Sequence, residues 1–262
     1  MHQADQLLAQ GDLAGARAAL VEHVRSEPGD AKARMFLFQL LAIAGEWDKA
    51  LKALDLIAQL SPEAQMMAVA YSQAIAGERL REEVFAGTAR AHVFGEERWA
   101  EGVADALQQQ CRGDAAAADD TRAEAFDAAP DTPGRFNETA VDWLADSDPR
   151  FGPTLEIIIA GRYGLIPFVA VDRIESEGPK DLRDLVWYPV EVAMKSGQSI
   201  AAFVPTRYPA TIRHGDTAEM LARATSWGES AAGGEEGRGQ RLLSLSDGSE
   251  AGLLELRTLV ID

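Results

Sequence analysis

Apolar residues recur at the three-and-four spacing of an amphipathic helix through the first half of the chain. One such series is Leu51, Leu54, Ile57 and Ala58. This pattern and the positions of glycine and proline predict helices near residues 3–10, 13–26, 30–44, 47–60, 63–77, 79–86, 96–111 and 115–128. The first half of the chain should therefore be a helical array.

The first four of these helices belong to a repeated unit. The stretches QGDLAGARAAL (10–20) and AGEWDKALKAL (44–54) align with a constant separation of 34 residues. The aligned pairs are Gly11 with Gly45, Asp12 with Glu46, Leu13 with Trp47, Ala16 with Ala50, Leu20 with Leu54, and Pro28 with Pro62. A 34-residue period with this pattern is typical of tetratricopeptide repeats, in which each unit is a helical hairpin.

Later copies of the repeat are less regular. Twice the period beyond the second copy, Gly113, Asp114, Ala118 and Pro130 fall in register. The intervening register carries Arg79 in place of glycine and Glu96 in place of proline, so the pair predicted over 63–86 is degenerate. Glycine matters at such a turn because a residue with a Cβ resists the backbone conformation required.

Beyond residue 130 the pattern changes to short runs typical of strands. The stretch 154–168 predicts a hairpin that turns at AGRYG, and further strands are expected within 171–177, 187–194, 199–208, 241–246 and 252–261, with turns at KSGQ and SDGSE. Residues 138–146 and 216–227 are interpreted as helices. The glycine-rich segment 229–240 is interpreted as a mobile loop. The predicted fold class is α+β and multidomain: a tetratricopeptide-like helical domain over 1–132, then a β-rich α+β domain over 133–262.

Charge and composition narrow the range of partners. Lysine and arginine number 25 against 42 acidic residues, which gives a net charge of −17. Such a chain repels phosphate backbones and anionic lipid, so neither nucleic acid nor membrane is expected as a partner. No apolar run approaches the length of roughly 20 residues that a membrane helix needs. The N-terminus has no signal-peptide pattern and Cys111 is the only cysteine, which together favour the cytoplasm.

A search for catalytic and metal-binding motifs returns little. Neither a P-loop, a dinucleotide fingerprint, a CxxC pair nor HExxH is present, and the four histidines have no ligand spacing. Asp142, Asp146 and Asp148 could bind a cation, but hydrated carboxylates near a helix end are the more common explanation. The sequence therefore predicts no enzyme activity, no catalytic residues, no metal and no cofactor.

Aromatic and arginine residues stand out in two stretches of the second half. DLRDLVWYPVEV contains Arg183, Trp187 and Tyr188, and VPTRYP contains Arg207 and Tyr208. These residue types are enriched where proteins bind one another, so the cluster is a candidate partner-binding surface. The alternative is that Trp187 and Tyr188 are sheet core and that the arginines pair with nearby carboxylates.

Several long strings together resemble one protein family. RMFLFQLLAIAGEWDKAL, DWLADSDPRFGPTLEIIIAGRYGLIPF, DLRDLVWYPVEV and VPTRYP resemble, in order and spacing, the ImpE family, also called SciE or TagJ. The resemblance runs from about residue 5 to about residue 227. The family's proteins are accessory components of bacterial type VI secretion systems.

The resemblance implies a cytoplasmic, non-enzymatic adaptor. Its partner would be the small subunit of the contractile sheath (TssB-like), bound through that subunit's N-terminal helix, with a link to the ClpV ATPase that disassembles sheaths. Because the first helix of each tetratricopeptide pair lines the groove of the array, Lys32, Met35 and Gln39 are the groove candidates.

Two other function classes stay open. One is a scaffold or chaperone for an unrelated protein, which would bind generic hydrophobic peptides equally well. The other is an enzyme with a site in the β-rich half around Asp181, Arg183 and Arg207. A deep pocket converging on those three residues would favour the enzyme.

Overall fold

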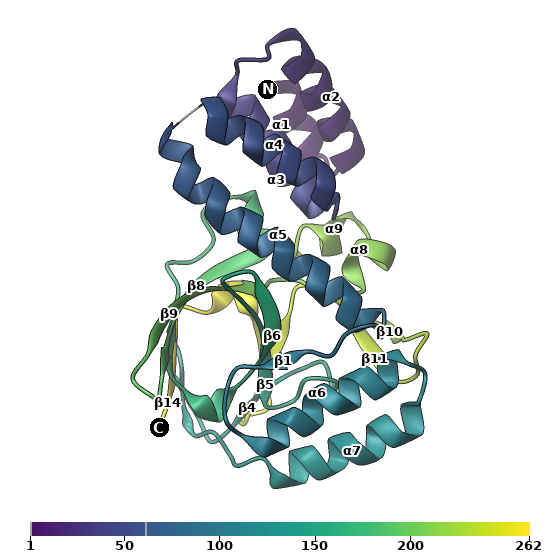
Figure 1. The fold of residues 1–262 in the computed structure, drawn as a ribbon, viewed down its shortest axis with the longest axis vertical. Coiled ribbons are helices and arrows are strands. Elements are labelled where there is room, and N and C mark those ends of the chain that lie inside the picture. The colour runs from purple at the N-terminus through teal and green to yellow at the C-terminus, as the bar shows by residue number, and fades with distance from the viewer. Residues whose placement is uncertain (1, 61) are drawn as a thin grey trace.

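The structure, a computed structural model, describes residues 2–60 and 62–262. Helices dominate the first half and strands the second (Figure 1). The long helices are α1 (His2–Ala9), α2 (Leu13–Ser26), α3 (Ala31–Ile43), α4 (Trp47–Leu60), α5 (Gln65–Phe85), α6 (Arg98–Cys111) and α7 (Ala115–Ala128). The α+β fold with a tetratricopeptide-like N-terminal part is as predicted.

The repeat residues perform the roles that their positions suggested. Gly11 and Gly45 have φ of 80° and 69° at the turns between paired helices, a conformation that glycine adopts without steric cost. The Asp12 carboxylate caps α2 by accepting the Gly15 amide at 2.8 Å. Ala16 and Ala50 are fully buried, so the paired helices approach closely there.

The predicted third hairpin over 63–86 is wrong. A short 3-10 helix, η1 (Pro62–Ala64), leads into α5, which runs without a break for 21 residues and passes through Arg79. Arg79 stands where the repeat has its turn glycine, and the nearby Gly77 stays helical, without the positive φ of Gly11 and Gly45. The later copy of the repeat does form a hairpin, α6 with α7, turning at Gly113 (φ 90°) and capped by Asp114.

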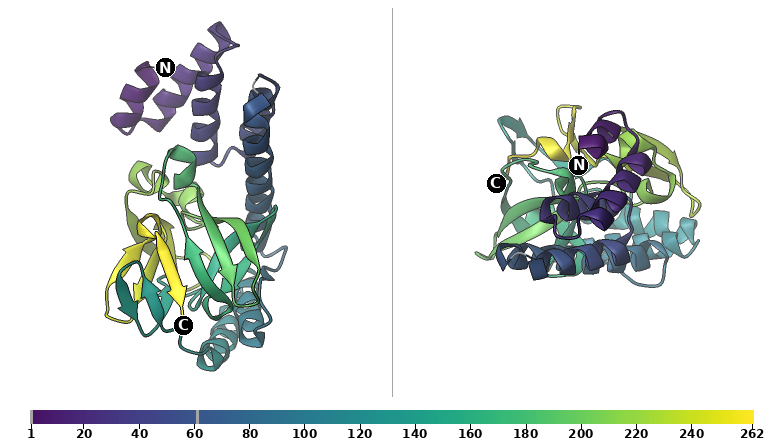
Figure 2. Two further views of the ribbon diagram at one scale, coloured as in Figure 1. Left: turned by 90° about the vertical axis from the view of Figure 1, so that its left-hand side faces the viewer. Right: turned by 90° about the horizontal axis from the view of Figure 1, so that it is seen from above.

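The second half is built on a curved nine-stranded sheet (Figure 2). All neighbours in it are antiparallel except β1 and β6, which are parallel. The order is β1 (His92–Val93), β6 (Arg162–Pro167), β5 (Thr154–Ile159), β9 (Ser199–Pro205), β8 (Trp187–Met194), β7 (Val171–Glu175), β14 (Thr258–Ile261), β2 (Gly134–Phe136), β3 (Thr139–Val141).

Two smaller sheets and several short helices complete the β-rich part. The sheets are β13 (Glu250–Gly252), β12 (Leu242–Leu245), β4 (Leu144–Asp146), and separately β10 (Thr225–Glu229) with β11 (Glu235–Gly239). The short helices are η2 (Phe168–Ala170), η3 (Leu182–Leu185), α8 (Thr211–His214), α9 (Thr217–Met220) and η4 (Leu253–Glu255). The hairpin predicted over 154–168 is confirmed, with Ala160 and Gly161 at its tip at positive φ.

Three local predictions are wrong. Residues 138–146 form β3 and β4 instead of a helix. The helix predicted over 216–227 starts at its expected cap, Asp216, but ends after Met220, because Ala222 takes a φ of 52° and β10 follows. The expected mobile loop over 229–240 contains β11. Gly237 there lies directly against the Tyr208 ring, where a side chain would not fit, while the mobility of the segment stays a prediction.

The helical and β-rich parts share one core. Trp187 at the start of β8 packs against Trp47 of α4 and Tyr71 of α5, with ring centroids 5.7 Å apart in both pairs. Tyr71 also lies 5.1 Å from the Phe203 ring of β9. Strand β1 joins the sheet although it precedes residue 132. The boundary at 132 stays a prediction, and the packing crosses it at several points.

Figure 1 shows α1–α4 at one end of the molecule, α5 running alongside the sheet, and α6 and α7 beside the sheet at the other end. Within residues 2–60 and 62–262, none of the helices combines the length and the apolarity needed to cross a bilayer.

Candidate functional site

The concave side of the helical array is filled by the chain itself. Segment η3 packs against α3, and the guanidinium of Arg183 lies 4.8 Å from the ring centroid of Tyr71 in α5. Arg183 also donates to the Met67 sulfur at 2.7 Å. Phe38 of α3 and Tyr71 meet edge to face at 6.0 Å, so the space between α3 and α5 is closed. A partner helix cannot enter there without displacing η3.

The three groove candidates on α3 differ in how far their side chains are exposed. Lys32 is exposed, Met35 is partly buried against the core, and Gln39 is buried. They therefore do not line an open groove together. A role for them in partner binding stays a prediction, and only Lys32 offers an exposed side chain.

The second candidate surface is mostly interior. Trp187, Tyr188, Arg207 and Tyr208 are all buried. The Tyr188 hydroxyl donates to the Leu256 carbonyl at 2.6 Å. Such residues form no surface in this structure, and the sheet-core alternative describes Trp187 and Tyr188 better.

The two arginines of that cluster are also engaged inside the protein. Arg183 pairs with Asp181 at 2.5 Å, as the alternative expected. Arg207 instead donates from Nη1 to the carbonyls of Ile43, at 3.0 Å, and Met220, at 2.7 Å. Because Ile43 ends α3, Arg207 ties the helical array to the β-rich part.

The family-resembling strings converge on a buried ionic network that sequence reasoning missed. At its centre Glu156 of β5 accepts Nε and Nη2 of Arg81 at 2.7 and 2.9 Å and the Tyr163 hydroxyl at 2.5 Å. Arg241 bridges Glu156 to Asp146, and the Tyr208 hydroxyl donates to Asp146 at 3.0 Å. All six members of the network are buried.

The arginines of the network offset the burial of Glu156 but not that of Asp146, whose pKa is raised by burial to about 7. Burial alone would raise the pKa of Glu156, but the positive charges of Arg81 and Arg241 hold that pKa at about 2. Burial raises the pKa of Glu78, whose closest charge partner is Arg81 at 3.4 Å. Because Arg81 of α5 binds Glu156 of β5 through two hydrogen bonds, the network joins α5 to the sheet.

Asp146 is a member of this network, and Asp148 lies beside it, paired with Arg150. Asp148 accepts Nε and Nη2 of Arg150 at 2.9 and 2.6 Å and the Gly237 amide at 3.1 Å. Both aspartates are therefore neither hydrated nor near a helix end, contrary to the expectation from sequence, while Asp142 is exposed. Among the described residues no group of three or more His, Cys, Asp or Glu is arranged to hold a metal ion.

The three residues around which an enzyme site was expected, Asp181, Arg183 and Arg207, do not line one cavity. A cavity of about 690 Å³ includes Asp181, Arg183 and Asp184 in its lining but not Arg207. Burial raises the pKa of Asp184. Its carboxylate accepts the amides of Lys180 at 2.6 Å and Asp181 at 3.1 Å, so it caps η3. The three residues named from sequence do not converge.

An open groove lies instead between α4 and α5. It encloses about 850 Å³, and its small or apolar floor is Ala58, Ala68, Val69 and Ala76, closed at one end by the β5–β6 turn at Ala160 and Gly161. Its polar rim consists of Asp55, Gln59, Gln65, Ser72 and Gln73. We call this surface the α4–α5 groove.

Exposed apolar side chains concentrate on the same two helices. Met66 and Val69 of α5 are 86% and 60% exposed. Within the described part of the chain, every large apolar side chain that is exposed belongs to α4 or α5 except Trp143; the others are Leu56, Leu60 and Leu80. These exposed apolar side chains distinguish α4 and α5 from the other described helices.

Comparisons with known proteins agree with these observations. The family model described as ImpE protein matches residues 138–260, and a tetratricopeptide repeat model matches residues 7–70. In fold, the chain is similar to the crystal structure of protein VPA1032 from Vibrio parahaemolyticus, with a TM-score of 0.87 and 22% identity over 99% of this chain and 97% of that one.

A curated relative is similar along almost the whole chain. The type VI secretion system accessory component TagJ of Pseudomonas aeruginosa is 43% identical over 257 residues, which cover 98% of this chain and 90% of TagJ. Identity at that level over that length is shared by members of one family. The chain therefore belongs to the ImpE family.

Proposed function

We propose that the protein is a non-enzymatic adaptor of a type VI secretion system that binds the N-terminal helix of the small sheath subunit in the α4–α5 groove. The observation that carries the proposal is the open α4–α5 groove, whose lining includes Val69, one of the five exposed large apolar side chains on these two helices. The similarity to TagJ, a type VI secretion accessory component, supplies the biological context.

The groove has the dimensions of a helix-binding site. Its wall on α5 runs from Gln65 to Ala76, which at 1.5 Å per residue is roughly 16 Å, or about three helical turns. Alanines on its floor allow the backbone of a partner helix to approach closely. An amphipathic helix binds in such a groove through residues spaced three and four apart, with its polar side toward the rim.

The filled concave side strengthens the case for this groove. Tetratricopeptide arrays commonly bind peptides on the concave side, but here η3 and Arg183 occupy it. The helical face left open is that of α4 and α5. A link to the ClpV ATPase, directly or through the sheath, is part of the same proposal and would use a different surface of the protein.

Calorimetric titration tests the proposal. The full chain is titrated with a synthetic peptide of the N-terminal helix of the sheath small subunit from the same genome, and with a scrambled peptide of equal composition. We expect micromolar binding of the first peptide, about −8 kcal/mol, and at least tenfold weaker binding of the second. Equal binding of both would favour the scaffold or chaperone alternative, and absence of binding by either would contradict the adaptor.

A further inference from the structure

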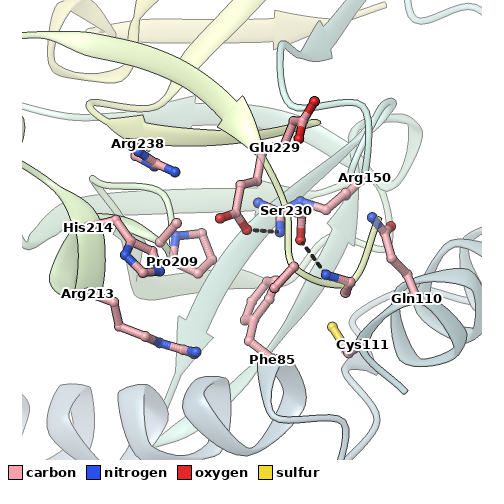
Figure 3. A pocket seen from close by; sticks show the side chains of 14 residues that line it. Phe85, Gln110, Cys111, Arg150, Pro209, Arg213, His214, Glu229, Ser230 and Arg238 are labelled. Carbon is pink, nitrogen blue, oxygen red and sulfur yellow. Dashed lines mark hydrogen bonds and ion pairs between the residues drawn. The ribbon is translucent and has the colours of Figure 1, made fainter. Parts of the chain in front are cut away.

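A second cavity lies at the other end of α5 from the α4–α5 groove. It holds about 440 Å³ and lies between Phe85 at the end of α5, Cys111 at the end of α6, the α8 region and the β10–β11 hairpin (Figure 3). The hairpin is fastened over α6 by Gln110, which donates to the Gly233 carbonyl at 2.5 Å. A volume of this size suits a small molecule and is too small for a helix.

Three arginines line this cavity. Arg150 is held by Asp148, at 2.9 and 2.6 Å, and lies 3.4 Å from Glu236. The side chains of Arg213 and Arg238 have no hydrogen-bond or ion-pair partner within residues 2–60 and 62–262, so both guanidinium groups are available to a ligand in the cavity.

One nitrogen of the Arg238 guanidinium is left without a hydrogen-bond acceptor. Its Nε atom is buried and makes no hydrogen bond within the described ranges. A buried donor that is left unsatisfied destabilises the protein, and an acceptor on a bound ligand would remove that cost. Gly228 makes room for the guanidinium, since a Cβ on Gly228 would lie only 2.8 Å from Nη2 of Arg238.

The lining of the cavity is slightly positive although the protein is strongly acidic and Asp148, behind the lining, pairs with Arg150. Besides the three arginines, the cavity is lined by His214 and by two carboxylates, Glu229 and Glu236. Three positive against two negative side chains leave a net charge of +1 with His214 neutral. Figure 3 shows Arg213, His214 and Arg238 gathered along one side of the cavity. Guanidinium groups bind phosphoryl and carboxylate oxygens through paired hydrogen bonds.

We propose that this cavity binds a small anionic molecule through phosphoryl or carboxylate oxygens held by Arg213 and Arg238. Phe85, Pro209 and Ala210 supply apolar contacts for the remainder of the ligand. The ligand would contact α5, α6 and the β10–β11 hairpin together, and so would fasten the hairpin to the helices. This site is independent of the partner-binding groove.

Cys111 provides a direct readout, because it lines the cavity and is the only cysteine in the sequence. Burial raises the pKa of its thiol, so labelling with a thiol reagent is followed at alkaline pH, where more of the thiol is deprotonated. The probes are inorganic phosphate and, separately, citrate, with potassium chloride at matched ionic strength as the control. At a probe concentration about ten times its dissociation constant, labelling should slow roughly tenfold.

Arginine variants test whether the protection of Cys111 comes from binding in this cavity. Arg213→Gln removes an exposed side chain, and Arg238→Gln removes the buried donor; each should reduce protection at the same probe concentration at least fivefold. Arg98→Gln and Arg223→Gln are matched controls, because both are exposed arginines outside the cavity. Protection by phosphate alone or by citrate alone assigns the ligand class. Equal labelling rates with probe and with chloride, or unchanged protection in both cavity variants, would overturn the proposal.

Discussion

Arg81 of α5 and Glu156 of β5 form a buried two-point ion pair, with N–O distances of 2.7 and 2.9 Å, across 75 positions of sequence. The pair lies between the helix that ends the repeat array and the central strands of the sheet. Arg81 also donates to the Arg207 carbonyl at 2.8 Å, and Arg207 in turn donates to Ile43 of α3. The orientation of the helical array on the β-rich part therefore depends on this network.

Neutralising the centre of the network should destabilise the protein strongly. In Glu156→Gln the charges of Arg81 and Arg241 lose a buried counter-charge, and the expected loss is about 3–5 kcal/mol in the free energy of unfolding. Denaturant titration followed by tryptophan fluorescence measures it.

Arg135→Gln is the matched control for that experiment. It breaks a surface pair whose atoms are 4.0 Å apart, and should change stability by less than about 1 kcal/mol. Similar midpoints for the Glu156 and Arg135 variants would show that the network does not hold the parts together.

The same carboxylate predicts an acid dependence. The pKa of Glu156 is held at about 2, below the value near 4.3 of a glutamate in an unfolded chain. Because the pKa is lowered in the folded state, the contribution of Glu156 to stability is complete above about pH 4.3 and is lost as pH falls toward about 2. The stability difference between the wild type and Glu156→Gln should therefore shrink over this window. If the difference in unfolding free energy were the same at about pH 6 and at about pH 3, the lowered pKa of Glu156 would be contradicted.

The repeat glycines should differ in their sensitivity to substitution. Gly45→Ala places a Cβ at a φ of 69° and 2.7 Å from the Ile212 side chain of α8, so both strain and a clash at the interface are expected. Gly113→Ala has comparable strain but no atom within 4 Å.

We expect a loss of about 1–2 kcal/mol for Gly113→Ala and a larger one for Gly45→Ala. Gly29→Ala, where φ is ordinary and no atom lies within 4 Å, should be near neutral. Thermal melts of the three variants give the ranking, and equal losses at positions 45 and 113 would show that contact with α8 contributes nothing.

Dividing the chain at residue 132 should not yield two well-folded proteins. In the fragment 133–262, Glu156 would have no Arg81 to pair with. Trp187 would also lose its ring contacts with Trp47 and Tyr71. We expect weak near-ultraviolet circular dichroism for each fragment alone and its recovery when the two are mixed. Native-like spectra for the separate fragments would instead support the domain boundary predicted from the sequence.

Local signals in the sequence predicted much of the fold. Gly11, Gly45 and Gly113 marked real turns because the backbone conformation there depends on glycine itself. The strand runs were recognisable because alternation and turn residues lie close together in sequence. The helix expected over 138–146 failed because β3 pairs with its neighbour β2, and because the partner of β4, β12, is contributed by residues 242–245, about a hundred positions away.

The site was harder to predict, for the same physical reason. Glu156 stands in the apolar run TLEIII, which hints at a buried charge, but its partners Arg81 and Arg241 lie 75 and 85 positions away. Tryptophan, tyrosine and arginine are common both at interfaces and in cores, so composition did not distinguish the two for Trp187 and Arg207. The α4–α5 groove depends on which helix faces are left uncovered, which only packing decides.

The most direct test of the account is calorimetric titration of the sheath-helix peptide into Val69→Asp beside the wild type. Val69 is on the floor of the groove, so burying a carboxylate there should weaken binding at least tenfold, by about 1.4 kcal/mol or more. Leu80→Asp is the matched control, because Leu80 is an exposed apolar residue of the same helix outside the groove, and it should bind like the wild type. Unchanged binding by Val69→Asp would place the partner elsewhere and contradict the central claim.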